Sequence, residues 1–290
     1  MAANHFTSTS QEQSAVRLEA LFSPAPITLQ NLVVVGMSRY LYEFMGHVLA
    51  PGKLQGLATS PSWRDDIPYL HRFLRSPAAQ NLRSLTVSPY VECLYHPPPG
   101  VPEALFVRKI FGAAIAQCTR VQYLRLGLVE CPSAECFLAP LSTVCPLLAN
   151  LPASLRAFSL HIWITITLQE SEGWARAVRS WNTLMNSLAA VDRALDPAGE
   201  EGKRRFQHLR RIELHVHFWS VGESARNGDA AEKHERQGDI ERVAAAAMPL
   251  PRLKAAGLLR EFLVDNVVHA RAEECGEIMA DVYWPSDSET

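Results

Sequence analysis

A short apolar phrase recurs along the chain and constrains the fold more than any other feature of the sequence. The phrase is Leu-x-x-Leu-x-Leu, with another apolar residue in place of Leu at some positions. Clear copies begin at Leu82, Val121, Leu155 and Leu209, and weaker copies begin at Leu29, Leu54 and Leu259. A unit that recurs in this way is typical of proteins built from repeated supersecondary elements. The phrase therefore predicts a scaffold and names no function.

Strands and helices are predicted to alternate along the chain. Each copy ends in alternating apolar and polar residues, as in 160–166 and 212–217, which indicates a strand. Apolar residues at helical spacing lie between the copies, in the groups Tyr40/Phe44/Val48, Ile67/Leu70/Phe73/Leu74 and Leu105/Ile110/Ala114/Ile115. The longest helical segment runs from about 170 to 195, before Pro197. This order favours an α/β fold with a parallel sheet.

Two α/β architectures compete, and the polar residues of the strands discriminate between them. In a doubly wound sheet the strands are buried on both faces and read as continuous apolar runs. Here polar residues alternate with the apolar ones at Ser84, Thr86, Arg125, Ser159, His161, Glu213 and His215. One face of the sheet is therefore expected to meet water. We predict an irregular leucine-rich-repeat solenoid, with parallel strands on its concave face and helices on its convex face.

The repeat region is predicted to span most of the chain. We expect residues 1–26 to be a partly disordered N-terminal segment, 27–270 the repeat domain and 271–290 a C-terminal tail. The spacing between successive copies of the phrase grows from 25 to 54 residues. Polar stretches near 197–205 and 222–239 are predicted to be flexible loops, because they bury too little apolar surface to offset their ordering entropy.

In the segments 73–87 and 147–160, a helix end leads into a strand through a short polar turn. With these segments and the recurring phrase, the chain resembles the divergent leucine-rich-repeat half of fungal F-box proteins. The repeat consensus also has an Asn three residues after the last Leu. Here those places hold Tyr90, Val129, Trp163, His217 and Val267. Val16, Leu18, Leu21 and Phe22 form only a fragment of an F-box pattern.

Composition and cysteine usage limit the classes of protein to which this chain can belong. The formal net charge is −2, so no broad basic field exists for nucleic acid or an anionic membrane. No apolar run reaches the roughly 18 residues of a membrane span. The six cysteines form no C-x-x-C pair and are expected to be reduced and buried. We expect a protein of the cytoplasm or nucleus.

Motifs of known enzymes are absent from the sequence. We find no G-x-G-x-x-G, no G-x-x-x-x-G-K-[ST], no G-x-S-x-G and no H-E-x-x-H. The basic cluster 203–211 is interpreted mainly as a solvated loop. Trp174 and Trp181 are interpreted as core contacts of the long helix. No cofactor, metal or catalytic residue is predicted.

A polar and aromatic patch on the strands is the candidate site. It comprises Arg125, His161, Trp163, Glu213, His215 and His217. His208 lies nearby in the sequence. Residues two apart on a strand share a face, and an exposed Trp is a favoured interface anchor. The patch is interpreted as a protein-binding surface, with ordinary solvated strand residues and a weak two-histidine metal site as alternatives.

The predicted function is a non-catalytic protein-interaction module. The resemblance implies substrate recognition in an SCF-type ubiquitin ligase, with a Skp-type adaptor as a second partner. An α/β enzyme with an unfamiliar site, built on a doubly wound sheet, is the alternative. A truncated repeat protein without retained activity is a third reading.

Overall fold

The computed structural model describes residues 26–37, 39–61, 67–87, 112–130, 151–167, 173–199, 206–221, 238 and 250–268. The expected N-terminal segment and C-terminal tail fall outside this range almost entirely, as do 200–205 and 222–237 of the expected loops. Among the described helices, none combines the length and the apolar character needed to cross a membrane.

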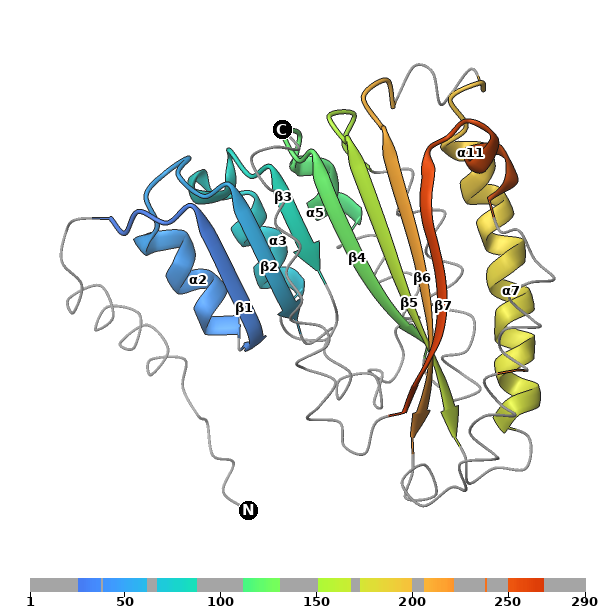
Figure 1. Cartoon of the computed structure of the whole chain (residues 1–290). Helices are drawn as coiled ribbons and strands as arrows, with labels where there is room; N and C mark the ends of the chain where they lie inside the picture. The colour runs from blue at the N-terminus through green and yellow to red at the C-terminus, as the bar shows by residue number, and fades with distance from the viewer. Residues whose placement is uncertain are drawn as a thin grey trace, which may run out of the picture.

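The described strands form one all-parallel sheet of seven strands in chain order, which confirms the predicted α/β class (Figure 1). They are β1 (Asn31–Met37), β2 (Gly56–Pro61), β3 (Ser84–Val87), β4 (Tyr123–Glu130), β5 (Ala157–Thr167), β6 (Arg211–Val221) and β7 (Leu259–Val268). β1 and β7 are the two edges, so the sheet is open. A doubly wound sheet reverses its strand order at a switch point. The described strands show no reversal, so the doubly wound alternative is wrong.

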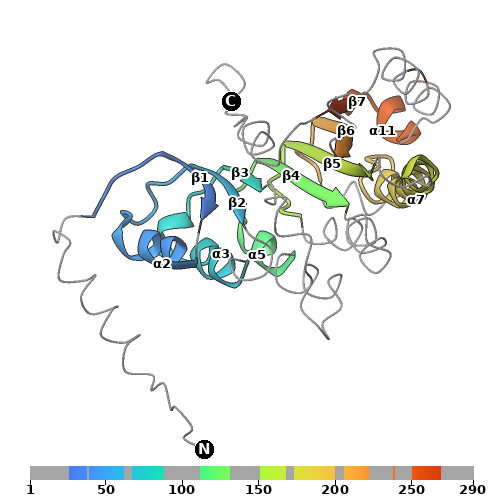
Figure 2. The same cartoon turned by 90° about the horizontal axis from the view of Figure 1, so that it is seen from below.

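The described helices lie on one side of the sheet (Figure 2). They are α2 (Arg39–Val48), α3 (Ile67–Leu74), the 3-10 turn η1 (Pro77–Ala79), α5 (Gly112–Gln117), α7 (Gly173–Ala194) and α11 (Pro251–Ala255). Connections between parallel strands are almost always right-handed. When every connection also steps in the same direction along the sheet, each one crosses the same face. The opposite face carries no described helix, and we call it the open face.

The recurring phrase places one apolar row across the sheet beneath the helices. Its fourth positions are paired laterally in register: Leu57, Leu85, Leu124, Phe158 and Ile212. Each of these side chains is at most 2% exposed. Burial of one such side chain stabilises the fold by about 1.5–3 kcal/mol. The row ties neighbouring repeats together because each member is paired with the equivalent residue of the next strand.

A second row, made by the main chain, joins the repeats where the strands begin. The carbonyl of Gln55 accepts hydrogen bonds from the N–H groups of Arg83 and Ser84, at 2.7 and 3.0 Å. The carbonyls of Gln30, Arg83, Gln122 and Arg156 accept two consecutive N–H groups in the same way. Each acceptor is the second residue of its phrase. This carbonyl row satisfies backbone donors between repeats whose phrases lack the consensus asparagine.

Two of the predicted helices need a correction or a limit. The stripe predicted for 40–48 is shifted, because Tyr40 is 56% exposed whereas Tyr42 and Met45 are buried. The Tyr42 hydroxyl also bonds to the hydroxyl of Thr59, a buried polar residue on the helix-covered face. Only the end of the helix predicted from Leu105 is described, as α5.

The long helix α7 lies along the last strands and confirms the prediction for 170–195. Trp181 is 2% exposed and contacts Phe218 of β6 and Phe262 of β7, with ring centroids 5.9 and 6.5 Å apart. The side chain of Trp174 lies outside the described residues. α7 therefore covers the part of the sheet formed by the last strands, β6 and β7.

Candidate functional site

The side chains of five of the six predicted patch residues, all except Trp163, lie together on the open face. Their strands are β4, β5 and β6, and the register pairs His161 with His215 and Trp163 with His217. One step along the strands, a second row runs through Arg125, Ser159, Glu213 and Glu261. The side chain of Trp163 lies outside the described residues, so only its register position is known.

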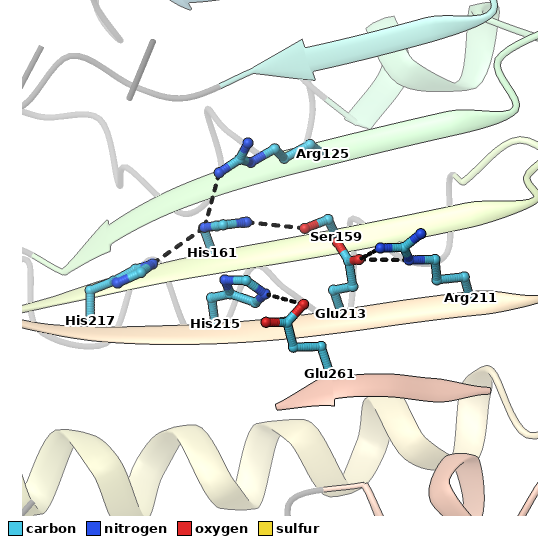
Figure 3. A network of polar contacts seen from close by, with 8 residues as sticks. All are labelled: Arg125, Ser159, His161, Arg211, Glu213, His215, His217 and Glu261. Atoms are coloured by element: carbon cyan, nitrogen blue, oxygen red, sulfur yellow. Dashed lines mark hydrogen bonds and ion pairs between the residues drawn. The ribbon is translucent and has the colours of Figure 1, made fainter. Parts of the chain in front are cut away.

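Three histidine side chains meet at the centre of the patch (Figure 3). The Nδ1 atom of His161 is 3.3 Å from Nε2 of His217. The ring centroids of His161 and His215 are 4.3 Å apart, and those of His161 and His217 are 5.5 Å apart. One nitrogen from each ring lies within 4.8 Å of the other two. We call His161, His215 and His217 the histidine cluster.

The expectation that these polar residues meet water is wrong for two members of the cluster. His161 is 4% exposed and His217 is 7% exposed. Neighbouring strands lie only about 4.8 Å apart. Aromatic rings at paired and diagonal positions therefore cover one another, as the near-parallel rings of His161 and His217 show. His208, by contrast, is exposed and is not part of the cluster.

The contacts of His161 select one tautomer of its ring. The Arg125 guanidinium, which can only donate, lies 3.4 Å from Nδ1. Nδ1 therefore accepts, and Nε2 carries the proton and donates to the Ser159 hydroxyl at 3.0 Å. The lone pair of Nδ1 consequently points toward Arg125 and His217.

Burial disfavours the charged form of two members of the cluster, His161 and His215. Burial, aided by the nearby Arg125, His215 and His217, lowers the pKa of His161 to about 2. Burial also lowers the pKa of His215, although the carboxylates of Glu261 and Glu213 oppose this shift. A neutral imidazole at His161 or His215 carries one nitrogen with a lone pair, which is the form of histidine that binds a metal ion.

Charged residues line the side of the cluster toward the strand starts. The Arg211 guanidinium donates from Nε to Glu213 Oε1 at 2.6 Å and forms an ion pair with the same carboxylate. Glu261 Oε2 lies 3.6 Å from His215 Nε2, a buried atom without a hydrogen-bond partner. The predicted site does not include Glu261, and Arg211 belongs to the segment 203–211 that is predicted to be a solvated loop leading into a strand.

A shift of register brings Glu261 to this position. Six copies of the phrase are aligned laterally, but the pairing of β6 with β7 is irregular between Ile212 and Glu213. Alignment of the phrases would place Glu261 beside Arg211. The observed register places it beside Glu213, two residues further along the strand. The alternation of apolar and polar residues along β7 identifies the face of the sheet on which Glu261 lies. Which residues of β6 lie beside Glu261 depends on the irregular pairing between the two strands.

A hollow of about 230 Å³ opens between these side chains on the open face. Its lining includes Ser84, Thr86, Tyr123, Arg125, Ser159, His161, Arg211, Glu213, His215 and Glu261. The lining carries positive and negative charges and the hydroxyl groups of Ser, Thr and Tyr side chains. The arrangement can bind a polar group, and its nitrogen lone pairs can coordinate a metal ion.

Comparison with models of known protein families and with curated proteins gave no match for this chain. The fold and site together define a class: an open, all-parallel α/β sheet with the described helices on one face and a polar hollow on the other.

Proposed function

We propose that this chain is a leucine-rich-repeat-like solenoid that binds a protein partner on its open face. The observation that carries the proposal is that the described helices cover one face of the sheet, while the other face bears a hollow lined by polar side chains from β3 to β7. Repeat proteins use such extended sheet surfaces for recognition. The mechanism is non-catalytic.

The main-chain contacts between repeats support the solenoid part of the proposal. Five carbonyls at equivalent positions each accept two consecutive N–H groups of the next repeat. In a solenoid, each repeat contacts mainly its neighbours. The carbonyl row and the apolar row both run from one repeat to the next in this manner.

The partner-binding surface comprises the six predicted residues together with Arg211 and Glu261. An ion pair with Arg211 holds the carboxylate of Glu213 beside the hollow, and the carboxylate of Glu261 lies 3.6 Å from His215 Nε2. A polar segment of a partner can exchange these contacts for its own. Charges at the rim of an interface act more on the association rate and its salt dependence than on affinity.

Affinity purification from the native host, followed by mass spectrometry, identifies the partner. The decisive comparison is direct binding of that partner to the Trp163→Ala/Glu213→Ala double variant. A matched control is the Glu43→Ala/Arg72→Ala variant, which removes an exposed ion pair between α2 and α3 at 2.6 Å. Binding should be lost in the first variant and kept in the second. Equal binding by both variants refutes the proposed surface.

The resemblance to fungal F-box proteins extends the proposal to substrate recognition in an SCF-type ubiquitin ligase. Its support is the repeated phrase and the position of all described helices on one face of the sheet. The test is co-purification of a Skp-type adaptor with the chain and with any N-terminally extended transcript. If neither recovers an adaptor, the ligase role fails while the protein-binding proposal stands.

A further inference from the structure

The histidine cluster has the donor set of a transition-metal site. We propose that His161, His215 and His217 bind one divalent transition-metal ion, with Zn²⁺ as the best match. The sequence offered only His215 and His217, two residues apart on one strand. The fold supplies His161 from the neighbouring strand. This inference is independent of the protein partner proposed above.

The spacing of two donor atoms already fits a tetrahedral ion. Zinc lies about 2.0–2.1 Å from a histidine nitrogen, so two nitrogens of one tetrahedron are roughly 3.3–3.4 Å apart. His161 Nδ1 and His217 Nε2 are separated by 3.3 Å. The third nitrogen lies within 4.8 Å of both. A rotation of the His215 side chain, which is 15% exposed, has to close a remaining gap of at most about 1.4 Å to reach that tetrahedral spacing.

Partners of the outer ring nitrogens support the same site. A histidine that binds a metal usually donates its other N–H group to a carboxylate or another acceptor, which fixes the ring. His161 Nε2 has such an acceptor in the Ser159 hydroxyl, 3.0 Å away. His215 Nε2 faces Glu261 Oε2 at 3.6 Å and has no closer partner. Figure 3 shows that the second nitrogen of His215 lies on the side of the ring toward the other two histidines.

Arg125 acts against the metal in this arrangement. Its guanidinium lies 3.4 Å from His161 Nδ1, the lone pair that the metal needs. It also places a positive charge beside the ion. Arg125 must therefore turn away when the metal binds. Removal of this side chain should strengthen metal binding, whereas removal of a side chain with only a structural role would not.

Three histidines leave one position of a tetrahedron open. Sites of this kind bind water or another small ligand at the fourth position. His161 and His215 line the hollow together with Arg125 and Glu213, so the fourth ligand would enter from that side.

The test uses the full chain, stripped of metal with a chelator, and Zn²⁺ alone as the probe. Competition with a fluorescent zinc indicator gives stoichiometry and affinity, and Co²⁺ substitution reports tetrahedral coordination through intense visible absorption. Seven further histidines and six cysteines can bind zinc elsewhere in the chain, so the comparison is between variants. His215→Gln and His217→Gln test the site, and His208→Gln is the matched control because His208 is exposed.

The expected result is the loss of one zinc equivalent in both cluster variants and its retention in the control. Affinity should fall by at least about 100-fold, because loss of an outer-shell partner alone costs 10–100-fold. Ser159→Ala should weaken binding by about 10–100-fold, and Arg125→Gln should strengthen it several-fold.

Unchanged stoichiometry and affinity in His215→Gln and His217→Gln overturn the proposal, as does an equal loss in His208→Gln. His161→Gln is the variant most at risk of misfolding, because its side chain is buried. The half-buried His215 therefore carries the test, with circular dichroism to verify that the variant is folded. Octahedral Co²⁺ absorption in the wild-type chain would also refute the three-histidine tetrahedral site.

Discussion

Asp192 should be one of the most sensitive positions for stability outside the apolar core. It lies in the last turn of α7, is 3% exposed, and acts as a helix cap across a gap of sixty residues. Its Oδ1 accepts the N–H groups of Arg252 and Leu253 at 3.1 and 3.0 Å. These N–H groups belong to the first turn of α11, whose own N-cap, Leu250, has no side-chain acceptor.

The cost of Asp192→Ala can be worked out from these contacts. Loss of a helix cap costs about 0.5–2 kcal/mol. A buried N–H group left without an acceptor costs about 1–3 kcal/mol. The Leu253 N–H bond is buried, whereas water can reach Arg252 more readily. Relief of the buried carboxylate charge offsets part of the loss. We expect the free energy of unfolding to fall by about 2–3 kcal/mol.

Arg252→Ala is the matched control for this change. It keeps the backbone N–H bond to Asp192 and removes only the ion pair with Asp196, 3.3 Å long, whose arginine is 56% exposed. Such exposed pairs contribute about 0–1 kcal/mol. Asp192→Asn keeps one acceptor oxygen and should fall between the two.

Urea unfolding followed by tryptophan fluorescence and far-ultraviolet circular dichroism measures these differences. For a chain of this size, Asp192→Ala should lower Tm by roughly 3–5 °C. The reasoning is refuted if Asp192→Ala lies within about 0.5 kcal/mol of wild type, or if Arg252→Ala costs as much. A cap that fails should also loosen β7, which directly follows α11 and carries Glu261.

Three further predictions concern single residues of the scaffold and site. Gly52 has φ +65°, and an added Cβ would lie 2.8 Å from Asn81 Nδ2. Gly52→Ala should therefore lower the free energy of unfolding by about 1–2 kcal/mol through backbone strain, and further through the clash with Asn81. Gly257→Ala should cost less, because Gly257 has φ +69° but nothing lies within 4 Å of the added Cβ. Equal losses in urea unfolding would contradict this. Burial raises the pKa of the Cys118 thiol to about 12, so Cys118→Ala should leave native thiol labelling unchanged and remove one reactive thiol in denaturant. A loss of native labelling in Cys118→Ala would show that this thiol is accessible. Burial holds the pKa of His161 at about 2 in the folded chain, whereas its ordinary pKa is about 6.5. Below about pH 6.5, His161 therefore binds a proton in the unfolded chain but stays neutral in the folded chain. Stability of the chelator-treated protein should then fall as pH decreases below 6.5, by up to about 1.4 kcal/mol per pH unit, with a smaller slope in His161→Gln. The prediction is contradicted if urea titrations from pH 7 to 5 give the same pH dependence of stability for the wild-type chain and His161→Gln.

The sequence by itself determined the order of the strands and helices and the face that each strand residue occupies. The alternation after each Leu-x-x-Leu-x-Leu phrase is a local property of an extended chain, so Arg125, His161 and Glu213 could be assigned to one face. The long helix α7 was predictable for the same reason, because its apolar residues repeat at helical spacing.

The tertiary structure alone decided which side chains meet. His161 and His217 are 56 residues apart in the sequence, and only the lateral register of β5 and β6 brings their nitrogens together. That packing also buried rings that the alternation assigned to water. The irregular pairing of β6 with β7 placed Glu261 beside the cluster. The docking of α11 against α7 brought two backbone N–H groups to the carboxylate of Asp192. Such contacts depend on register and docking, which a local pattern of apolar and polar residues does not specify.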